Sequence, residues 1–242
     1  MKSILIIPSR LASTRLLEKP LHIINGKPLI QHVFERAKSS YQGRIVVACC
    51  DERVKKLIES LGGEAVLTAP DLPSGTDRIY EAYTKIGESE DIIINLQGDM
   101  AIFPSELISK TLDVFNHVPS DVVTAISKLD QDILNPSLVK VAFEKHHNST
   151  DDLTFGRAHY FSRAPIPYDA KHFFKHIGIY IYTKKALAEF VKAPVSDLES
   201  IEKLEQLRGL ALNHRYGATL VNGDYFSVDT IEDVAAVENY FK

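Results

Sequence analysis

The sequence predicts an α/β protein built on a doubly wound sheet, with a smaller mixed α/β lobe in its second half. In the first half, short apolar runs alternate with segments of helical periodicity, which is typical of parallel strands joined by crossover helices. The expected strands are 3–8, 44–49, 64–68 and 91–96, and the expected helices are 28–37, 52–61 and 77–86. Arg10, Cys50 and Asp99 directly follow three of these strands, so we expect a binding site at the carboxyl ends of the strands.

Local signals support the ends of these helices. Pro28 stands where a first helical turn tolerates proline. Asp51 can cap the helix 52–61, and the pair Gly62-Gly63 is expected to end it.

The second half has a different character. Its expected strands are 122–127, 139–144, a segment ending at 162, and 176–182. Ser196-Asp197-Leu198-Glu199 forms a capping box, which predicts one helix from there to about Asn213, with Leu198, Ile201, Leu204 and Leu207 along one face. A last strand at 225–228 and a helix at 231–240 capped by Thr230 complete the chain. We therefore expect a single domain over 1–242 that includes a lobe at about 122–212.

Composition limits the possible functions. The 242 residues are 45% hydrophobic and carry a formal charge of −4, which argues against a nonspecific nucleic-acid partner. No leader pattern or apolar run long enough for a membrane span occurs. The two cysteines, Cys49 and Cys50, are adjacent and cannot easily form a disulfide. We expect a cytoplasmic protein with no membrane partner.

The loop after the first strand concentrates positive charge. Arg10, Arg15 and Lys19 lie within ten residues, and the small residues Ser9, Ala12 and Ser13 allow close backbone approach. Guanidinium and ammonium groups suit a polyphosphate. The GxxxxGK[ST] and GxGxxG patterns are absent, so another loop design would bind it. The alternative is an ordinary solvated loop.

Two acidic residues stand in the same local setting. Asp99 and Asp229 each follow a short apolar strand. Mg²⁺ prefers one or two carboxylates together with phosphate oxygens and water, so both could share one ion. The alternative for each is that it caps the next helix.

Other polar groups have two interpretations. In Ser74-Gly75-Thr76-Asp77-Arg78, the arginine could contact a nucleotide's base or ribose, or only form a salt bridge. Period-two alternation places His176, Gly178, Tyr180 and Tyr182 on one strand face. With Glu202, Glu205 and Gln206 these could hydrogen-bond a polyol, or they form a half-buried strand beside a solvated helix face.

Together these motifs resemble one family. Nearly the whole chain is similar to the 3-deoxy-D-manno-octulosonate cytidylyltransferase (CMP-Kdo synthetase) family, within the Rossmann-like sugar nucleotidyltransferases. The matching segments are IIPSRLASTRLLEKPLHIINGKPLIQHVFERA, SGTDR, INLQGD, NPSLVKV, YFSRAPIP, HIGIYIY, LESIEKLEQLR and VDTIEDV.

The resemblance implies a function and a set of site residues. It implies transfer of the cytidylyl group of CTP to Kdo, giving CMP-Kdo and pyrophosphate for lipopolysaccharide or capsule precursors, in a homodimer paired through the second lobe. Arg10, Arg15 and Lys19 would hold the triphosphate with Ser13, and Asp99 and Asp229 would bind Mg²⁺. Gly75, Thr76 and Arg78 would belong to the cytidine pocket, and Pro8 would contact substrate. The implied Kdo-binding set, with Gln97 beside the metal, is Arg163, His176, Tyr180, Glu205 and Gln206.

Three positions depart from the family's pattern. Where the family has QGDEP, this chain has QGDMA, with Met100 in place of the acid. Where the family has RLPGKP, this chain has RLLEKP, with Glu18 in place of the glycine. Where the family has ATD, this chain has Ala48-Cys49-Cys50. These changes leave open an analogue such as 8-amino-Kdo as the acceptor, or a degenerate CTP-binding paralogue with little transfer activity.

Overall fold

The chain divides into two compact units. The computed structural model describes residues 1–11, 15–87 and 89–241. One unit comprises Met1–Glu106 with Gly223–Lys242, and the other Leu107–Asn222. Both contain helices and strands, which confirms the mixed α/β class. Within the described ranges, no helix is both long and apolar enough to cross a bilayer.

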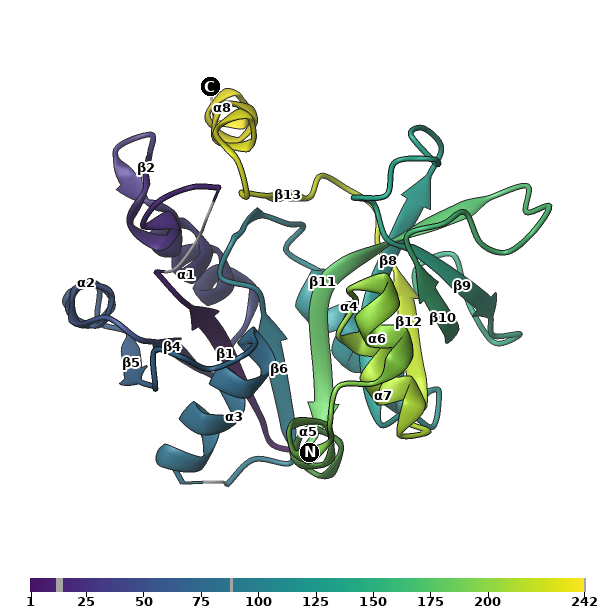
Figure 1. The fold of residues 1–242 in the computed structure, drawn as a ribbon, viewed down its shortest axis with the longest axis horizontal. Coiled ribbons are helices and arrows are strands. Elements are labelled where there is room, and N and C mark those ends of the chain that lie inside the picture. The colour runs from purple at the N-terminus through teal and green to yellow at the C-terminus, as the bar shows by residue number, and fades with distance from the viewer. Residues whose placement is uncertain (12–14, 88, 242) are drawn as a thin grey trace. The chain divides into compact units, whose positions relative to one another are not determined.

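The first unit contains a parallel sheet. Its strands lie in the order β5 (Glu64–Leu67), β4 (Arg44–Cys49), β1 (Ser3–Ser9) and β6 (Ile92–Leu96). Helices α1 (Leu29–Ser40) and α2 (Glu52–Ser60) cover one face and α3 (Gly75–Lys85) the other (Figure 1). The strand order reverses between β1 and β6, and open α/β sheets bind ligands at the carboxyl ends of such strands.

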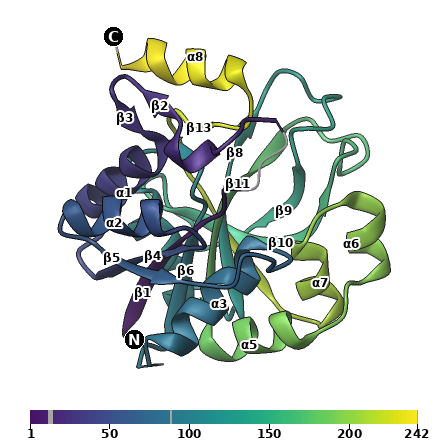
Figure 2. The same cartoon turned by 60° about the vertical axis from the view of Figure 1, so that its left-hand side comes forward.

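Short elements complete the first unit. They are the 3-10 turn η1 (Lys19–Leu21), β2 (Ile23–Ile24), β3 (Lys27–Pro28), β7 (Met100–Ile102), β13 (Phe226–Ser227) and α8 (Ile231–Tyr240). β7 and β13 pair antiparallel. Helix α8 lies beside the β2–β3 hairpin (Figure 2), where Asn25 Nδ2 donates to the carbonyl of Glu238 at 3.3 Å. The last helix therefore contacts the hairpin that follows η1.

The second unit is built on a curled mixed sheet. Its strands lie in the order β11 (Phe173–Thr183), β8 (Val122–Leu129), β12 (Tyr216–Leu220), β10 (Thr154–Ser162) and β9 (Lys140–Lys145). Only the β8–β12 pair is parallel among the described pairings of this unit. β9 also pairs with β11, so the sheet closes on itself. The other elements are α4 (Leu107–Asp113), η2 (Val114–Asn116), α5 (Lys184–Lys192), α6 (Asp197–Glu202) and α7 (Gln206–Ala211).

The prediction of one helix from Ser196 to Asn213 is wrong. The chain forms α6 and α7, separated by Lys203 in a left-handed conformation with φ 55°. Arg163 donates from Nε to the carbonyl of Glu202 at 2.7 Å and from a terminal nitrogen to that of Lys203 at 3.2 Å. These bonds satisfy carbonyls that end a helix. The break buries Leu204 and Leu207 but leaves Leu198 and Ile201 exposed.

The predicted caps are confirmed. Asp51 accepts from the backbone N–H of Arg53, and capping boxes start α6 at Ser196 and α8 at Thr230. Pro28 lies just before α1 rather than inside it, and α3 starts two residues earlier than expected because Ser74 caps it. Cys49 and Cys50 are both free.

The buried ion pair between Glu199 and Arg208 joins α6 to α7. Arg208 donates two hydrogen bonds to the carboxylate, at 2.9 and 2.6 Å.

Glu199→Ala would leave a guanidinium buried without this partner, so we expect the free energy of unfolding to fall by about 3–5 kcal/mol. Urea unfolding measures this. Glu59→Ala, which removes the exposed partner of Lys55, should cost at most about 0.5 kcal/mol. Similar losses for both variants would contradict the prediction.

Candidate active site

The end of β1, the start of α3 and the loop after β6 meet at the carboxyl ends of β1 and β6. A Cβ on Gly98 would lie 2.3 Å from the carbonyl oxygen of Pro8, so glycine permits this close approach of the two segments. A Cβ on Gly75 would lie 3.3 Å from Pro8 Cγ and 3.6 Å from Gln97 Oε1. The structure thus brings together Pro8, Gly75 and Gln97, all predicted substrate-binding residues.

A hydrogen-bonded line of side chains supports this group. Gln97 Nε2 donates to Asn95 Oδ1 at 3.1 Å, and Asn95 Nδ2 donates to Thr76 Oγ1 at 3.4 Å. Asn95 and Thr76 are fully buried. Because a buried amide needs partners, Asn95 fixes the orientation of Gln97 and joins it to the first turn of α3.

Arg78 lies in the interior of the first unit. It is 1% exposed, and its guanidinium donates to Thr68 Oγ1 at 2.5 Å and to the carbonyl of Ala69 at 2.9 Å. Thr68 Oγ1 donates in turn to the carbonyl of Cys49. Arg78 therefore positions the segment after β5, and any effect on a nucleotide would pass through that segment.

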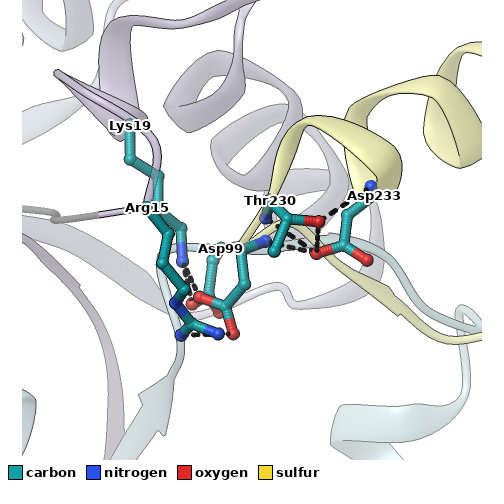
Figure 3. Close-up of polar contacts among 6 residues, drawn as sticks. Arg15, Lys19, Asp99, Thr230 and Asp233 are labelled. Carbon is teal, nitrogen blue, oxygen red and sulfur yellow. Dashed lines mark hydrogen bonds and ion pairs between the residues drawn. The ribbon is translucent and has the colours of Figure 1, made fainter.

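Asp99 and Asp229 converge on one cation. The backbone N–H of Val228 donates to the carbonyl of Asp99 at 2.9 Å, as β7 pairs with β13. Lys19 Nζ donates to Asp99 Oδ2 at 2.6 Å and to Asp229 Oδ1 at 2.7 Å (Figure 3). The two carboxylates are 29% and 41% exposed. Both acids therefore lie at one place that solvent ions can reach.

The helix-capping alternative is wrong for Asp229. The cap of α8 is Thr230, whose hydroxyl accepts from the N–H of Asp233 (Figure 3). Asp99 precedes the strand β7, not a helix. Both carboxylates are thus directed to the basic loop instead.

Arg15 adds a second cation to this cluster. Its guanidinium lies 3.2 Å from Asp229 Oδ2. Burial raises the pKa of Asp229, but the hydrogen bonds and charges of Lys19 and Arg15 outweigh it, and the pKa of this carboxyl is lowered. Arg10 is exposed directly after β1. Ser13 lies outside the described residues.

In the second unit, four of the predicted sugar contacts lie together. The rings of His176 and Tyr180 have centroids 5.1 Å apart, and the Tyr180 hydroxyl donates to Gln206 Oε1 at 3.1 Å. Burial, and then the charge of Glu205, raise the pKa of Tyr180. A bulge between Ile177 and Tyr180 adds two residues to β11, so His176 and Tyr180 remain on one face.

His176 is held as a neutral ring. Its Nε2 lies 2.9 Å from Thr124 Oγ1. Burial lowers the pKa of His176 to about 3. The imidazole therefore offers one neutral donor and one neutral acceptor, which suit hydroxyl groups.

Arg163 has a different environment from these four. Its guanidinium donates to the carbonyls of Glu202 and Lys203, and to that of Pro136 at 2.8 Å. The buried Lys140 Nζ donates to the carbonyl of Arg163 at 2.6 Å. The structure thus places Arg163 as the group that fixes the turn between α6 and α7, just before Glu205.

Comparison with known proteins identifies the family. Residues 4–217 match the model of the family described as "Cytidylyltransferase". The chain belongs to the cytidylyltransferase family. It is 40% identical to the 3-deoxy-manno-octulosonate cytidylyltransferase of Thermodesulfovibrio yellowstonii, over 98% of this chain and 97% of that protein. It is also 40% identical to the 8-amino-3,8-dideoxy-manno-octulosonate cytidylyltransferase of Shewanella frigidimarina, over 98% of each chain.

Solved structures agree with this assignment. The structure of CMP:2-keto-3-deoxy-manno-octonic acid synthetase complexed with CTP is 34% identical and superimposes with a TM-score of 0.89, covering 100% of this cytidylyltransferase and 98% of that chain. Apo UDP-glucose pyrophosphorylase is 16% identical, with a TM-score of 0.71 over 100% of this chain and 98% of the other. The latter likeness shows a shared nucleotidyltransferase fold.

The three departures from the family pattern have structural settings in this cytidylyltransferase. Met100 is buried in β7. The Glu18 carboxylate lies 2.8 Å from the guanidinium of Arg53 on α2. Cys50 is partly exposed after β4, and Asp51 beside it caps α2. Glu18 thus has a cationic partner outside the cluster of Lys19, Asp99 and Asp229.

Sequence reasoning missed several residues that shape the site. Asn95, Thr124 and Lys140 were not selected, although each is a fully buried polar residue within a strand. A polar residue inside an apolar run, as in IIINL or SLVKVAF, is a signal that could have found two of them.

The pKa of His176 predicts an acid-sensitive stability. An unperturbed histidine titrates near 6.5, so below that pH the unfolded chain binds a proton that the folded His176 does not. Stability is then lost as the pH falls from about 6.5 toward 3, by about 1.4 kcal/mol per unit. Between pH 7 and pH 5 we expect wild type to lose about 2 kcal/mol more than His176→Asn.

Urea unfolding at both pH values measures this difference. His172→Asn is the matched control, because it alters an exposed histidine near the start of the same strand. The prediction fails if His176→Asn shows the same pH dependence as wild type.

Proposed function

We propose that this cytidylyltransferase couples CTP to the anomeric hydroxyl of a 3-deoxy-ulosonic acid of the Kdo type. The hydroxyl oxygen forms a bond to the α-phosphorus of CTP, the bond from that phosphorus to the bridging oxygen breaks, and pyrophosphate leaves. The hydroxyl proton is lost to solvent. The observation that carries the proposal is the meeting of Asp99 and Asp229 beside Lys19 and Arg15 in a chain of this family.

The first unit supplies charge and the nucleotide contacts. Arg10, Arg15 and Lys19 would bind the triphosphate, since guanidinium and ammonium groups pair strongly with phosphate oxygens. The group of Pro8, Gly75 and Gln97 would hold the nucleoside end, with Asn95 and Thr76 fixing its geometry. Positioning and charge neutralisation are the main contributions of the protein to phosphoryl transfer.

The acidic pair fits Mg²⁺. In residues 1–11, 15–87 and 89–241, no group of three or more acidic, histidine or cysteine side chains could hold a metal. An ion bound by Asp99 and Asp229 would thus take its other ligands from phosphates and water, as Mg²⁺ usually does. When bound, Mg²⁺ would neutralise the phosphate oxygens and lower the pKa of the attacking hydroxyl.

The second unit supplies the sugar contacts. His176, Tyr180, Glu205 and Gln206 would bind the hydroxyl groups, and Arg163 would hold the α6–α7 turn that carries Glu205. His176 stays neutral at physiological pH because its pKa is about 3. Kdo is the first candidate acceptor. The relative named for 8-amino-3,8-dideoxy-manno-octulosonate, equal in identity, makes the 8-amino analogue the second.

A pyrophosphate-release assay tests this function. We expect release with CTP, Mg²⁺ and either Kdo or 8-amino-Kdo, and little with ATP, GTP or UTP. Asp99→Asn and Asp229→Asn should lower kcat by at least about 100-fold, because charge stabilisation at the transferring phosphate is lost. Circular dichroism should show that both variants remain folded.

The control is Asp151→Asn, which removes an exposed carboxylate in a turn of the second unit and should keep the wild-type rate. Release with neither sugar acid would favour a degenerate CTP-binding paralogue. Release with a hexose 1-phosphate would assign another nucleotidyltransferase activity. Near wild-type rates for Asp99→Asn or Asp229→Asn would refute the metal assignment.

We also propose that two copies associate through the second unit. Val195, Leu198 and Ile201 expose 59%, 47% and 74% of their surface at the start and along α6. Exposed apolar groups gathered on one element are typical of an interface.

Light scattering should find a dimer for wild type and a monomer for Ile201→Glu. Ile23→Glu, an exposed isoleucine of the first unit, should remain dimeric. A monomeric wild type, or a dimeric Ile201→Glu, would contradict this.

A further inference from the structure

The ammonium group of Lys19 lies between the two proposed metal ligands. It donates to Asp99 at 2.6 Å and to Asp229 at 2.7 Å, and its side chain is 14% exposed, less than either carboxylate. Two carboxylates close together repel each other unless a cation lies between them. Lys19 therefore occupies the place between the two carboxylates that would hold a divalent cation.

The charges of this cluster balance without a metal. Lys19 and Arg15 provide two positive charges, and Asp99 and Asp229 provide two negative ones. If a divalent ion replaces the two cations on the carboxylates, the cluster acquires an excess of two positive charges. A triphosphate is the kind of ligand that such an excess attracts.

The backbone of Lys19 is held while its side chain can change partners. η1 begins at Lys19, with the N–H of Leu21 donating to the carbonyl of Glu18 at 2.8 Å and with Pro20 buried. The ion pair of Glu18 with Arg53 connects this turn to α2. A lysine carries a point charge on a flexible four-carbon stem, so its ammonium can move from carboxylate to phosphate without a change in the turn.

We propose that Lys19 is an internal counter-ion that competes with the divalent metal in the nucleotide-free protein and moves to the triphosphate when nucleotide binds. This rests on the proposed function, since it takes Asp99 and Asp229 as the metal ligands. The metal and the triphosphate then strengthen each other's binding, because each removes a competitor of the other. Such coupling is reciprocal in binding free energy.

The affinity of the nucleotide-free protein for Mn²⁺ tests the proposal directly. Mn²⁺ is titrated into the full chain without nucleotide, and the free ion is measured by electron paramagnetic resonance. Lys19→Met keeps the length of the side chain and removes its charge. We expect this variant to bind Mn²⁺ more tightly than wild type, by about 5- to 150-fold, the usual range of coupling between sites.

Lys27→Met is the matched control. It removes the same charge from the first unit, in an exposed ion pair with Glu35 outside the cluster, and should leave the affinity near the wild-type value. Lys19→Arg keeps the charge and should bind Mn²⁺ weakly, like wild type. Lys19→Gln provides the same test as Lys19→Met if the methionine variant does not fold.

The outcomes separate this proposal from the proposed function. Equal or weaker Mn²⁺ binding by Lys19→Met, or an equal gain in Lys27→Met, would overturn the counter-ion role. Asp99→Asn in the presence of CTP should weaken Mn²⁺ binding. If Asp99→Asn binds Mn²⁺ as wild type does, the metal assignment itself is wrong. If Asp99→Asn weakens binding but Lys19→Met does not tighten it, only the role of Lys19 fails.

Discussion

The pairing of β7 with β13 is the constraint on which the acidic cluster depends. Asp99 directly precedes β7 and Asp229 follows β13 after one residue, so the antiparallel register brings together two acids that are far apart in the chain. Arg36 of α1 donates to the carbonyl of Phe103 at the end of β7, which fixes this ribbon to the first unit. A shift in register would move both backbones and separate the carboxylates. Lys19 and Arg15 can then pair with Asp229 because the acids are already in place.

The two units use their charged groups in different ways. In the first unit, Lys19 and Arg15 pair with partly exposed carboxylates, so a stronger anion or cation can replace either partner. In the second unit, Lys140 donates to the carbonyl of Arg163, and Arg163 donates to the carbonyls of Glu202 and Lys203 at the α6–α7 turn. Carbonyls that end a helix or a strand need donors, and Lys140 and Arg163 supply them here. Lys140 and Arg163 therefore order the backbone, whereas Lys19 and Arg15 hold a pair of carboxylates that solvent can reach.

The sequence predicted the first unit better than the second, for physical reasons. Strands buried on both faces appear as apolar runs, and β4 begins and ends where the pattern placed it. Side-chain caps are local, so Asp51, Ser196 and Thr230 were found. The strands β7 and β12 and the helices α4 and α5 were missed. The break at Lys203 depends on Arg163, which is 40 residues away in the chain. The carbonyl partner of Arg78, Ala69, lies in the segment after β5, outside the helix that carries the arginine. A motif identifies such an arginine but not the oxygen that it binds.

The position of Glu18 shows how the charge added by a departure from a family pattern can be paired. The family's RLPGKP places glycine where this chain has Glu18, and Glu18 has φ 48°, a left-handed conformation that costs a non-glycine residue roughly 1–2 kcal/mol. Its ion pair with Arg53 at 2.8 Å is exposed to solvent and offsets little of this cost. The added negative charge is nonetheless paired with a cation of α2. Arg10, Arg15 and Lys19 then remain the charges of the loop that a triphosphate would meet, which is why we regard the substitution as compatible with catalysis.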